Sequence, residues 1–387
     1  MNLALLTSVA GNGGSASTAF HLTRLLCRAG HRAVLFAPGE YWPERGRAEG
    51  VPVQPGLELR RGFHAASFFR DYRTLKQYVN ENAVDAILVQ KSPEQWLAAA
   101  VRARAHKRPA LIRLRGVVFE IKPTATNRWL HNSMPLVVCS ASAIARQFQV
   151  LPEFRTDTVK VLLEGIDTQR FKPASAEEKR AARQHFGLQP TALYFGTAGR
   201  PSPVKGHDLL VRAFGRLCTE HSKMVERFDV RLAIFSDESR RGPGSYADLR
   251  DLSLACGAPD RVDLCPGFVE DMRDVYRALD SYVLPSRGSE GSSRAGLEAS
   301  ASGLPLIASS VGVLPDLVRD GETGLLVPPN DEAALAHALK RILDDESFAQ
   351  RLGTNARRRM ENELREDLYV ARLAELLTAA CTSKPKA

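Results

Sequence analysis

Short, unbroken runs of apolar residues alternate with amphipathic stretches along most of this chain. The apolar runs are residues 3–7, 33–37, 86–89, 110–114 and 136–139 in the first half, and 192–197, 231–235, 262–265, 281–284 and 305–308 in the second. Runs that are apolar at every position are typical of strands in a parallel sheet that helices cover on both faces. The two successive series therefore predict an α/β protein with two doubly wound, Rossmann-like domains.

Turn-forming residues mark the expected boundary between the domains. Residues 165–174 (GIDTQRFKPA) combine such residues with a proline and predict a hinge. We therefore expect domains over 1–165 and 166–365, followed by a C-terminal helical segment, 366–387. The stretch 347–379 is long, charged and strongly helical in character, and Asp331 after Asn330 predicts the N-cap of a helix around 335–343. In such folds ligands bind beyond the carboxyl ends of the strands, so the cleft between the domains is the expected active site.

Composition excludes several classes of protein. The 387 residues suit two domains, and 44% hydrophobic with 25% charged residues is the globular average rather than that of a disordered or fibrous chain. No apolar run approaches the roughly 18 residues of a membrane-spanning helix.

The start, MNLALLTSVAGNGG, has no basic leader or cleavage site, so we expect no signal peptide and a cytoplasmic location. The six cysteines are scattered without a C-x-x-C pair, which predicts neither a zinc site nor a disulfide framework and suggests small, mostly buried side chains.

The excess of basic residues lies in the first half of the chain. Residues 1–170 carry 23 Lys/Arg and 13 Asp/Glu, whereas 171–387 carry 30 and 31. Nine basic residues fall within 101–150 against one acid, Glu120: Arg102, Arg104, Lys107, Arg108, Arg113, Arg115, Lys122, Arg128 and Arg146. They form either a solvated surface or a field that attracts a nucleic acid, an anionic membrane or a phosphorylated acceptor. The chain shows no aromatic-and-basic platform for single strands, so nucleic acid is not expected.

A glycine-rich loop follows the first expected strand. Gly11, Gly13 and Ala16 fit the dinucleotide fingerprint G-x-G-x-x-A, but the acidic partner is missing, since the first acid after the second strand is Glu40 in a turn. We therefore interpret Gly13 and Gly14 as positions where the backbone comes close to a ligand or to the facing domain.

Two cations follow the strand expected at 192–197. Arg200 and Lys205 are five residues apart at its carboxyl end. An arginine can bond two oxygens of one phosphate, and a lysine supplies a compact charge. The pair can hold a diphosphate, although two ordinary surface cations would give the same pattern.

A second polar segment follows the strand at 281–284. Residues 285–298 (PSRGSEGSSRAGLE) carry Glu290 and Glu298 with seven residues between them. We expect a helix to begin near Ser292, so that the N–H groups of Gly291, Ser292 and Ser293 are free to bind a phosphate. Glu298 can then accept hydrogen bonds from a ribose, with Glu290 beside the group that is transferred. Each glutamate alone could equally be a partner of the helix dipole.

These residues resemble the C-terminal half of the family 4 retaining glycosyltransferases, which have the GT-B fold. The resemblance rests on Arg200 with Lys205, on Glu290 with Glu298, and on residues 301–331 (ASGLPLIASSVGVLPDLVRDGETGLLVPPND). Residues 162–173 resemble the interdomain hinge of that family, with Glu164 where asparagine is usual, and GHRAVLF at 30–36 fits its first domain.

The resemblance implies two Rossmann-like domains facing across a cleft, with the C-terminal helix returning to the first domain. It also implies that Arg200 and Lys205 neutralise the donor diphosphate, that Glu290 contacts the donor sugar, and that Glu298 binds the ribose. Glu290, Arg200 and Lys205 are the implied catalytic residues, without a metal or a resident cofactor.

The chain departs from the family pattern at two places. Ser292, Ser293 and Arg294 stand where a bulky residue and glycine are frequent, and Arg294 becomes a further phosphate contact. Where many members have a histidine, near the end of the strand at 110–114, this chain has Arg113 and Arg115, which suggests an anionic acceptor. The expected acceptor residues are therefore Gly13, Gly14, Arg113 and Arg115.

The expected activity is transfer of a hexosyl group, with retention of configuration, from a nucleotide-sugar to a glycan or lipid-linked acceptor. We expect a UDP-sugar as the donor, an anionic acceptor of the lipopolysaccharide type, and a place in the cytoplasm or on the inner face of the cytoplasmic membrane. Phe63, Phe68 and Phe69 could add an apolar contact there, although core packing also explains them. The alternatives are a nucleotide-sugar epimerase or a sugar-phosphate synthase on the same fold, and a sugar- or nucleic-acid-binding protein without turnover.

Overall fold

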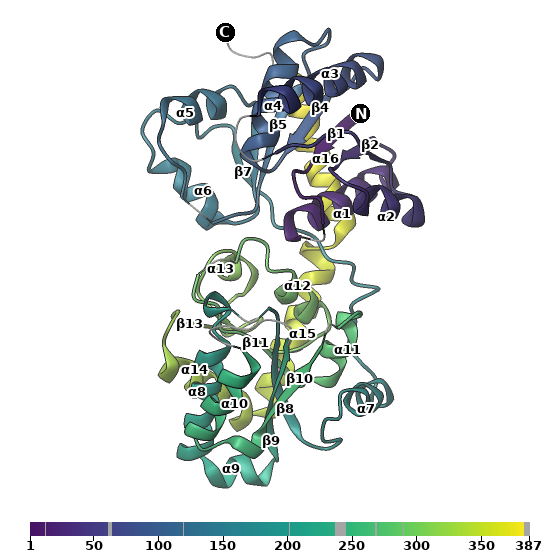
Figure 1. Cartoon of the computed structure of the whole chain (residues 1–387). Helices are drawn as coiled ribbons and strands as arrows, with labels where there is room; N and C mark the ends of the chain where they lie inside the picture. Colours follow the sequence, from purple (N-terminus) through teal and green to yellow (C-terminus); the bar gives the residue numbers. More distant parts are fainter. Residues whose placement is uncertain are drawn as a thin grey trace. The chain divides into compact units, whose positions relative to one another are not determined.

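The computed structural model describes residues 1–382 except 12, 61–63, 119, 201, 237–244, 268 and 289. The chain separates into two compact units (Figure 1). Unit 1 consists of Met1–Glu164 together with the segment from Glu366 onward, and unit 2 is Gly165–Arg365. The chain therefore passes between the units after Glu164 and again after Arg365.

Unit 1 contains a seven-stranded sheet in which every pair of neighbours is parallel. Its order is β3-β2-β1-β4-β5-β6-β7. The strands are β1 (Asn2–Leu6), β2 (Arg32–Phe36), β3 (Val53–Gln54), β4 (Ala86–Val89), β5 (Ala110–Arg115), β6 (Leu136–Cys139) and β7 (Val159–Val161). The register places Leu3 opposite Ala33 and Ala86, so the apolar runs of the central strands lie side by side.

The helices of unit 1 cover this sheet and include the end of the chain. They are α1 (Gly14–Arg28), α2 (Tyr41–Glu49), α3 (Ala65–Glu81), α4 (Ser92–Arg104), α5 (Ala125–Asn132), α6 (Ser142–Gln149) and α16 (Glu366–Thr382). Apolar residues of α16, Leu373 and Leu377 among them, pack with those of α1 and the central strands in one core. The C-terminal helix therefore belongs to the first Rossmann-like unit, as predicted.

Unit 2 repeats the scheme with six strands, again all parallel. The order is β10-β9-β8-β11-β12-β13. The strands are β8 (Leu193–Ala198), β9 (Val230–Ser236), β10 (Val262–Pro266), β11 (Ser281–Leu284), β12 (Leu306–Ser309) and β13 (Leu325–Val327). The helices are α7 (Ala176–His185), α8 (His207–Glu220), α9 (Ser222–Arg227), α10 (Tyr246–Ala255), α11 (Met272–Ala278), α12 (Arg294–Ala301), α13 (Leu314–Leu317), α14 (Glu332–Asp344) and α15 (Glu346–Glu363).

The ten predicted strands are all present, and their ends differ from the prediction by at most one residue. The Asp331 N-cap is also confirmed, because its carboxylate accepts a hydrogen bond from the N–H of Ala334 at 2.8 Å. The stretch 347–379 is helical as predicted, and it forms two helices, α15 and α16. The carbonyl of Leu364 accepts a hydrogen bond from the N–H of Ile166 at 2.8 Å, and this pairing separates α15 from α16.

Cysteine burial is only partly as predicted. All six cysteines are free, but only Cys139 and Cys265 are buried, and Cys381 is exposed.

Each sheet changes its winding direction at one place. In unit 1 this place lies between β1 and β4, and in unit 2 it lies between β8 and β11. Loops that leave such neighbouring strands in opposite directions leave room beyond the carboxyl ends of the strands, where α/β proteins bind ligands. The loops that follow β8 and β11 contain Arg200, Lys205 and Glu290, so the winding of unit 2 brings these segments to one edge of its sheet.

Candidate functional site

Glu290 and Lys205 form the centre of the site in unit 2. The Lys205 ammonium donates to Glu290 Oε1 at 2.6 Å, and the Ser286 hydroxyl donates to the same oxygen at 2.6 Å. The Glu290 side chain is 5% exposed, whereas that of Lys205 is 36% exposed. A buried carboxylate is thus held by two hydrogen bonds, and one partner is a cation that still reaches solvent.

The loop that carries Lys205 is fixed against the loop after β11. Lys205 ends a 3₁₀ turn, Pro203–Lys205, and Gly206 follows with φ +68°. A Cβ atom at Gly206 would lie 2.1 Å from the carbonyl oxygen of Pro285, so only glycine fits there. The Arg287 N–H donates to the Val204 carbonyl at 2.8 Å, and its guanidinium bonds both carboxylate oxygens of Asp208.

The backbone of Glu290 is held by a third segment. Its carbonyl accepts a hydrogen bond from the Val313 N–H at 2.9 Å. Gly312 has φ +59°, and a Cβ atom there would lie 1.9 Å from the Glu290 carbonyl oxygen. Three loops, after β8, β11 and β12, therefore determine where the Glu290 carboxylate lies.

Glu298 occupies a separate position in α12. The Tyr276 hydroxyl donates to Glu298 Oε2 at 2.9 Å, and the Arg294 guanidinium lies 3.4 Å from Oε1. The Glu298 side chain is 12% exposed. Burial raises the pKa of Glu298 above its usual range, while the charge of Arg294 and the Tyr276 hydroxyl act in the opposite direction.

The helix that carries Glu298 begins later than predicted. The helix was expected to start near Ser292; Ser293 is its N-cap, with φ +46°, and α12 begins at Arg294. The Ser293 side chain makes no capping bond, and its hydroxyl is buried without a partner among the described residues. Gly291 and Ser292 precede it in the loop and are partly exposed.

Arg200 stands apart from the Lys205–Glu290 pair. It follows β8, is exposed, and makes no ion pair within the described part of the chain. The structure thus brings Lys205 and Glu290 into direct contact, places Glu298 with Arg294, and leaves the Arg200 guanidinium in solvent.

His207 is a buried histidine next to the site. It is the first residue of α8 and 2% exposed, and its Nδ1 has no partner among the described residues. Burial, assisted by the charge of Lys205, lowers the pKa of His207 to about 4. The imidazole beside Lys205 is therefore neutral at physiological pH.

This buried imidazole makes stability depend on pH. In the unfolded chain this histidine has its ordinary pKa of about 6.5. Between pH 6.5 and 4 the unfolded state therefore binds a proton at this side chain that the folded state does not bind. The free energy of unfolding should fall as pH is lowered through this window, by about 3 kcal/mol in total for this group. Urea unfolding of His207→Gln between pH 7 and 4 should lose this part of the dependence, whereas His185→Gln, at an exposed histidine, should keep it. Equal pH profiles for the parent and His207→Gln would contradict the assignment.

Of the expected acceptor residues, Gly13 and Gly14 lie beyond the carboxyl end of β1, whereas Arg113 and Arg115 lie within β5. Gly13 is the N-cap of α1, and a Cβ atom there would lie 3.1 Å from the Val9 side chain. Gly14 is exposed, with open space around its Cα. Glu94 connects the segments that follow β1 and β4. Its carboxylate accepts hydrogen bonds from the N–H groups of Ser8, Gln90 and Lys91 at 2.6–2.8 Å.

Arg113 and Arg115 are not exposed cations. Arg115 is 5% exposed and donates to Gln147 Oε1 at 3.1 Å, with its guanidinium over the Phe148 ring. Arg113 is half-buried, and the Gln95 amide oxygen, in the orientation that satisfies both groups, lies 2.8 Å from its Nε. Burial and the charge of Arg115 lower the pKa of Arg113 to about 10.

The basic residues of 101–150 also do not gather at one edge. Arg104, Lys107 and Arg108 are exposed but precede β5, so they lie at the edge opposite to the carboxyl ends of the strands. Lys122 is exposed and follows β5. The expectation of one basic field beside the ligand-binding edge is therefore wrong for most of these side chains.

Among the described residues, no group of three or more His, Cys, Asp or Glu side chains lies close enough together to hold a metal ion. None of the described helices combines the length and the apolar character needed to cross a membrane.

Sequence-family models match both units. A model described as "Glycosyltransferase Family 4" matches residues 12–170, and one described as "Glycosyl transferases group 1" matches residues 189–345. The chain belongs to glycosyltransferase family 4.

Among curated proteins it is 35% identical over 217 residues to a D-inositol 3-phosphate glycosyltransferase of Streptomyces bingchenggensis, covering 56% of this chain and 46% of that protein. It is 36% identical over 201 residues to the protein of that name from Stackebrandtia nassauensis, covering 52% and 44%. The chain thus spans about half the length of these relatives.

Solved structures identify the fold as GT-B. A glycosyltransferase from Rickettsia africae superposes with a TM-score of 0.85 at 16% identity, covering 99% of both chains. HepE of Anabaena, solved in complex with UDP, gives a TM-score of 0.83 at 19% identity, covering 98% of this chain and 100% of that one. The family and the α/β fold class predicted from sequence are therefore confirmed.

Several residues around the site were not predicted. Ser286 and Tyr276 hold the two carboxylates, and His207 and Gly312 shape the surrounding loops. Gly312 lies in the segment on which the family resemblance rests, and His207 directly follows Lys205-Gly206. Closeness to these motifs is the one sequence feature that could have indicated that the two residues lie near the site. Nothing in the sequence marks Tyr276, because it comes from α11, far from the motif.

Proposed function

We propose that this protein transfers a glycosyl group from a nucleotide-sugar to an anionic acceptor, with unit 2 binding the donor. The observation that carries the proposal is the direct contact of Lys205 with Glu290 at the β8/β11 switch point, with Glu298 on the helix that follows. Lys205 faces the donor diphosphate together with Arg200, Glu290 faces the sugar, and Glu298 accepts hydrogen bonds from the ribose. Gly291 and Ser292 in the loop before α12, with Ser293 at its N-cap and Arg294 at its first position, add further contacts to the phosphates.

Donor binding changes the electrostatics of the central pair. Without a donor, Lys205 neutralises Glu290. A diphosphate brings additional negative charge to the exposed end of Lys205, which then has two anionic partners. Glu290 is buried and fixed by Ser286 and Val313, so the flexible lysine is the group that adjusts.

In the reaction the bond between the anomeric carbon and the diphosphate oxygen breaks, and a bond from an acceptor hydroxyl oxygen to that carbon forms. The hydroxyl proton passes to an oxygen of the departing diphosphate, and the nucleoside diphosphate leaves with the electron pair of the broken bond. Arg200, Lys205 and the loop N–H groups stabilise the departing charge in place of a metal. Retention of configuration requires attack from the face that the leaving group occupied.

The acceptor is proposed to carry a phosphate or carboxylate. Support comes from the exposed Lys122 after β5 and from the phosphate in the name of the relatives, D-inositol 3-phosphate glycosyltransferase. With Arg113 and Arg115 largely enclosed, they act by shaping the loop after β5, whose exposed cation is Lys122. A lipid-linked acceptor of the lipopolysaccharide type fits this chemistry.

The test is donor consumption by the full chain. Incubation with UDP-, GDP- and ADP-sugars should release nucleoside diphosphate with one nucleotide preferred, and an acceptor should increase the rate and form a glycosylated product. Epimerised donor without release would establish the epimerase alternative. Binding without any turnover of the three donors would establish a binding protein.

We further propose peripheral attachment of unit 1 to anionic membranes. Exposed Phe69 and Trp129 supply apolar contacts, and exposed basic residues contribute on the order of 1 kcal/mol each near anionic lipid. Sedimentation with anionic vesicles should therefore weaken steeply with salt. Lys122→Glu, next to α5, should weaken binding about tenfold, whereas Arg108→Glu, at the opposite edge of the sheet, should change it little. Absence of binding at low salt would contradict the proposal.

A further inference from the structure

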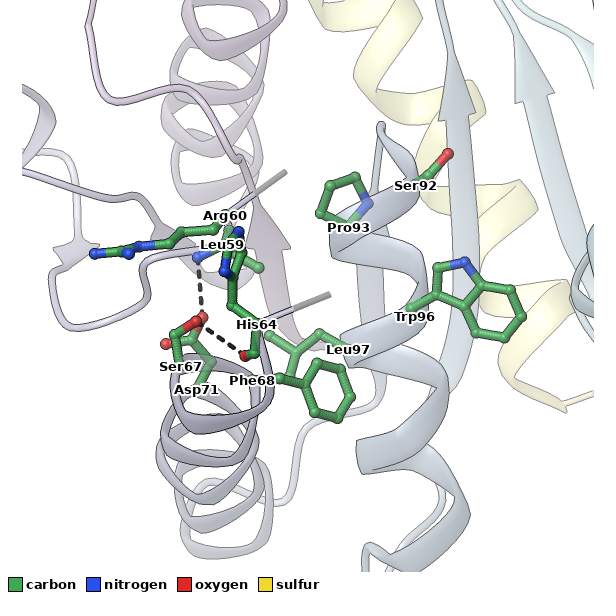
Figure 2. A pocket seen from close by; sticks show the side chains of 10 residues that line it. All are labelled: Leu59, Arg60, His64, Ser67, Phe68, Asp71, Ser92, Pro93, Trp96 and Leu97. Carbon is green, nitrogen blue, oxygen red and sulfur yellow. Dashed lines mark hydrogen bonds between the residues drawn. The ribbon is translucent and has the colours of Figure 1, made fainter. Parts of the chain in front are cut away.

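A cavity of about 390 Å³ lies in unit 1 between α3 and α4 (Figure 2). Its apolar lining consists of Leu59, Phe68, Pro93, Trp96 and Leu97. Phe68 of α3 and Leu97 of α4 both line it (Figure 2). The volume lies at the lower end of the range for small-molecule sites and holds about a dozen groups of the size of a methylene.

The charged side chains in the lining are already occupied. Asp71 is 3% exposed, and its two oxygens accept the N–H groups of Glu58 at 3.1 Å and Leu59 at 2.9 Å. Arg60 pairs with Glu58 at 2.8 Å, and its side chain extends away from α4. The Asp71 carboxylate is therefore not available to a ligand, and the Arg60 guanidinium lies in solvent rather than inside the cavity.

The remaining polar groups do not suit a sugar or a nucleotide. The Ser67 hydroxyl donates to the His64 carbonyl at 3.1 Å. The His64 ring and the Ser92 hydroxyl belong to exposed residues and so lie toward solvent. A sugar in this cavity would leave most of its hydroxyl groups without partners, which costs free energy for each one. A hydrocarbon loses nothing there.

The cavity continues into an exposed aromatic surface. Trp96 is 39% exposed and stacks on Trp129 of α5, with ring centroids 6.1 Å apart and planes at 12°. Phe69, adjacent to Phe68, is 58% exposed. Tryptophan at the edge of an apolar surface is typical of the boundary between lipid and water, which is where a chain would enter.

We propose that this cavity binds a single hydrocarbon chain of an anionic amphiphile, with the head group outside it. Assignment of that amphiphile as the glycosyl acceptor rests on the proposed function. The acceptor is then a lipid rather than a small phosphorylated alcohol, and unit 1 recognises its chain.

The test uses n-alkyl phosphates of four to fourteen carbons, each below its micelle concentration, titrated calorimetrically into the full chain without donor. Each added methylene should tighten binding about fourfold, levelling off at about a dozen carbons when the cavity is full. Inorganic phosphate is the probe for the head group alone and should not bind detectably. Affinity that does not depend on chain length would overturn the proposal.

Two adjacent phenylalanines give a matched pair of variants. Phe68→Ala removes a lining side chain and should weaken decyl phosphate binding at least tenfold, whereas Phe69→Ala should leave it within twofold. Trp96→Ala and Trp129→Ala form a second pair, since only Trp96 lines the cavity. Equal losses within both pairs would identify adsorption to the exposed surface and overturn the proposal.

The donor assay separates this inference from the proposed function. If alkyl phosphates bind more tightly with increasing alkyl length but no donor is consumed, the cavity assignment stands and the transferase assignment is wrong. Donor transfer to an alkyl-free acceptor, with no chain binding, does the reverse.

Discussion

Replacing Lys205 by alanine is expected to lower kcat for glycosyl transfer about a hundredfold or more. The reason is loss of the cation that stabilises the leaving diphosphate, a contribution of about 3 kcal/mol to the barrier. The measurement is nucleoside diphosphate release at saturating donor. A Lys205→Ala protein with unchanged kcat/KM would exclude this role.

The structure adds a stability effect that must be measured alongside. Lys205→Ala also removes the ion pair of Glu290, whose side chain is 5% exposed. Because the lysine itself is 36% exposed, water can replace part of the lost interaction, and the free energy of unfolding should fall by only about 1–2 kcal/mol. Lys340→Ala, which removes an ion pair with Asp344 on α14, is the matched control and should leave kcat unchanged.

The two glutamates are expected to separate chemistry from binding. Glu290→Gln should reduce transfer at least a hundredfold while nucleoside diphosphate affinity changes little, because Glu290 is proposed to face the sugar, which a nucleoside diphosphate lacks. Glu298→Gln should instead weaken nucleoside diphosphate binding by about 1.5–3 kcal/mol, the worth of hydrogen bonds to a charged group. Calorimetry with the nucleoside diphosphate and single-turnover transfer rates together measure both effects.

Glutamine keeps the local packing in both variants. At position 298 its amide oxygen can still accept the Tyr276 hydroxyl, so loss of affinity would report the missing charge rather than a collapsed helix. Glu346→Gln, at an exposed position at the start of α15, should change neither quantity. Roles exchanged between the two site variants would show that the sugar and ribose assignments are reversed.

Much of the fold could be predicted from local patterns. Strands such as β4 and β11 are buried at every position, and an unbroken apolar run is the direct consequence of burial on both faces. The strands β3, β7 and β13 escaped prediction because they are two or three residues long and lie at sheet edges. β3 and β7 are partly exposed there and carry polar residues, whereas β13 is apolar but only three residues long.

The break between α15 and α16 illustrates a different limit. Residues 347–379 have a helical composition throughout, and only the pairing of Leu364 with Ile166 interrupts them. That contact joins residues nearly two hundred positions apart, so no local pattern reports it.

The sequence by itself determined the fold class, the family and the identity of the polar residues at the strand ends of unit 2. Those features depend on residue type and spacing along one element. Only the tertiary structure decided that Lys205 is paired with Glu290, that Tyr276 holds Glu298, and that Arg115 is enclosed rather than presented to an acceptor. It alone also placed Phe68 and Trp96 around a cavity. The physical reason is that side-chain pairing, burial and cavities depend on which elements pack together. The local composition around a residue does not show which distant residue will contact it.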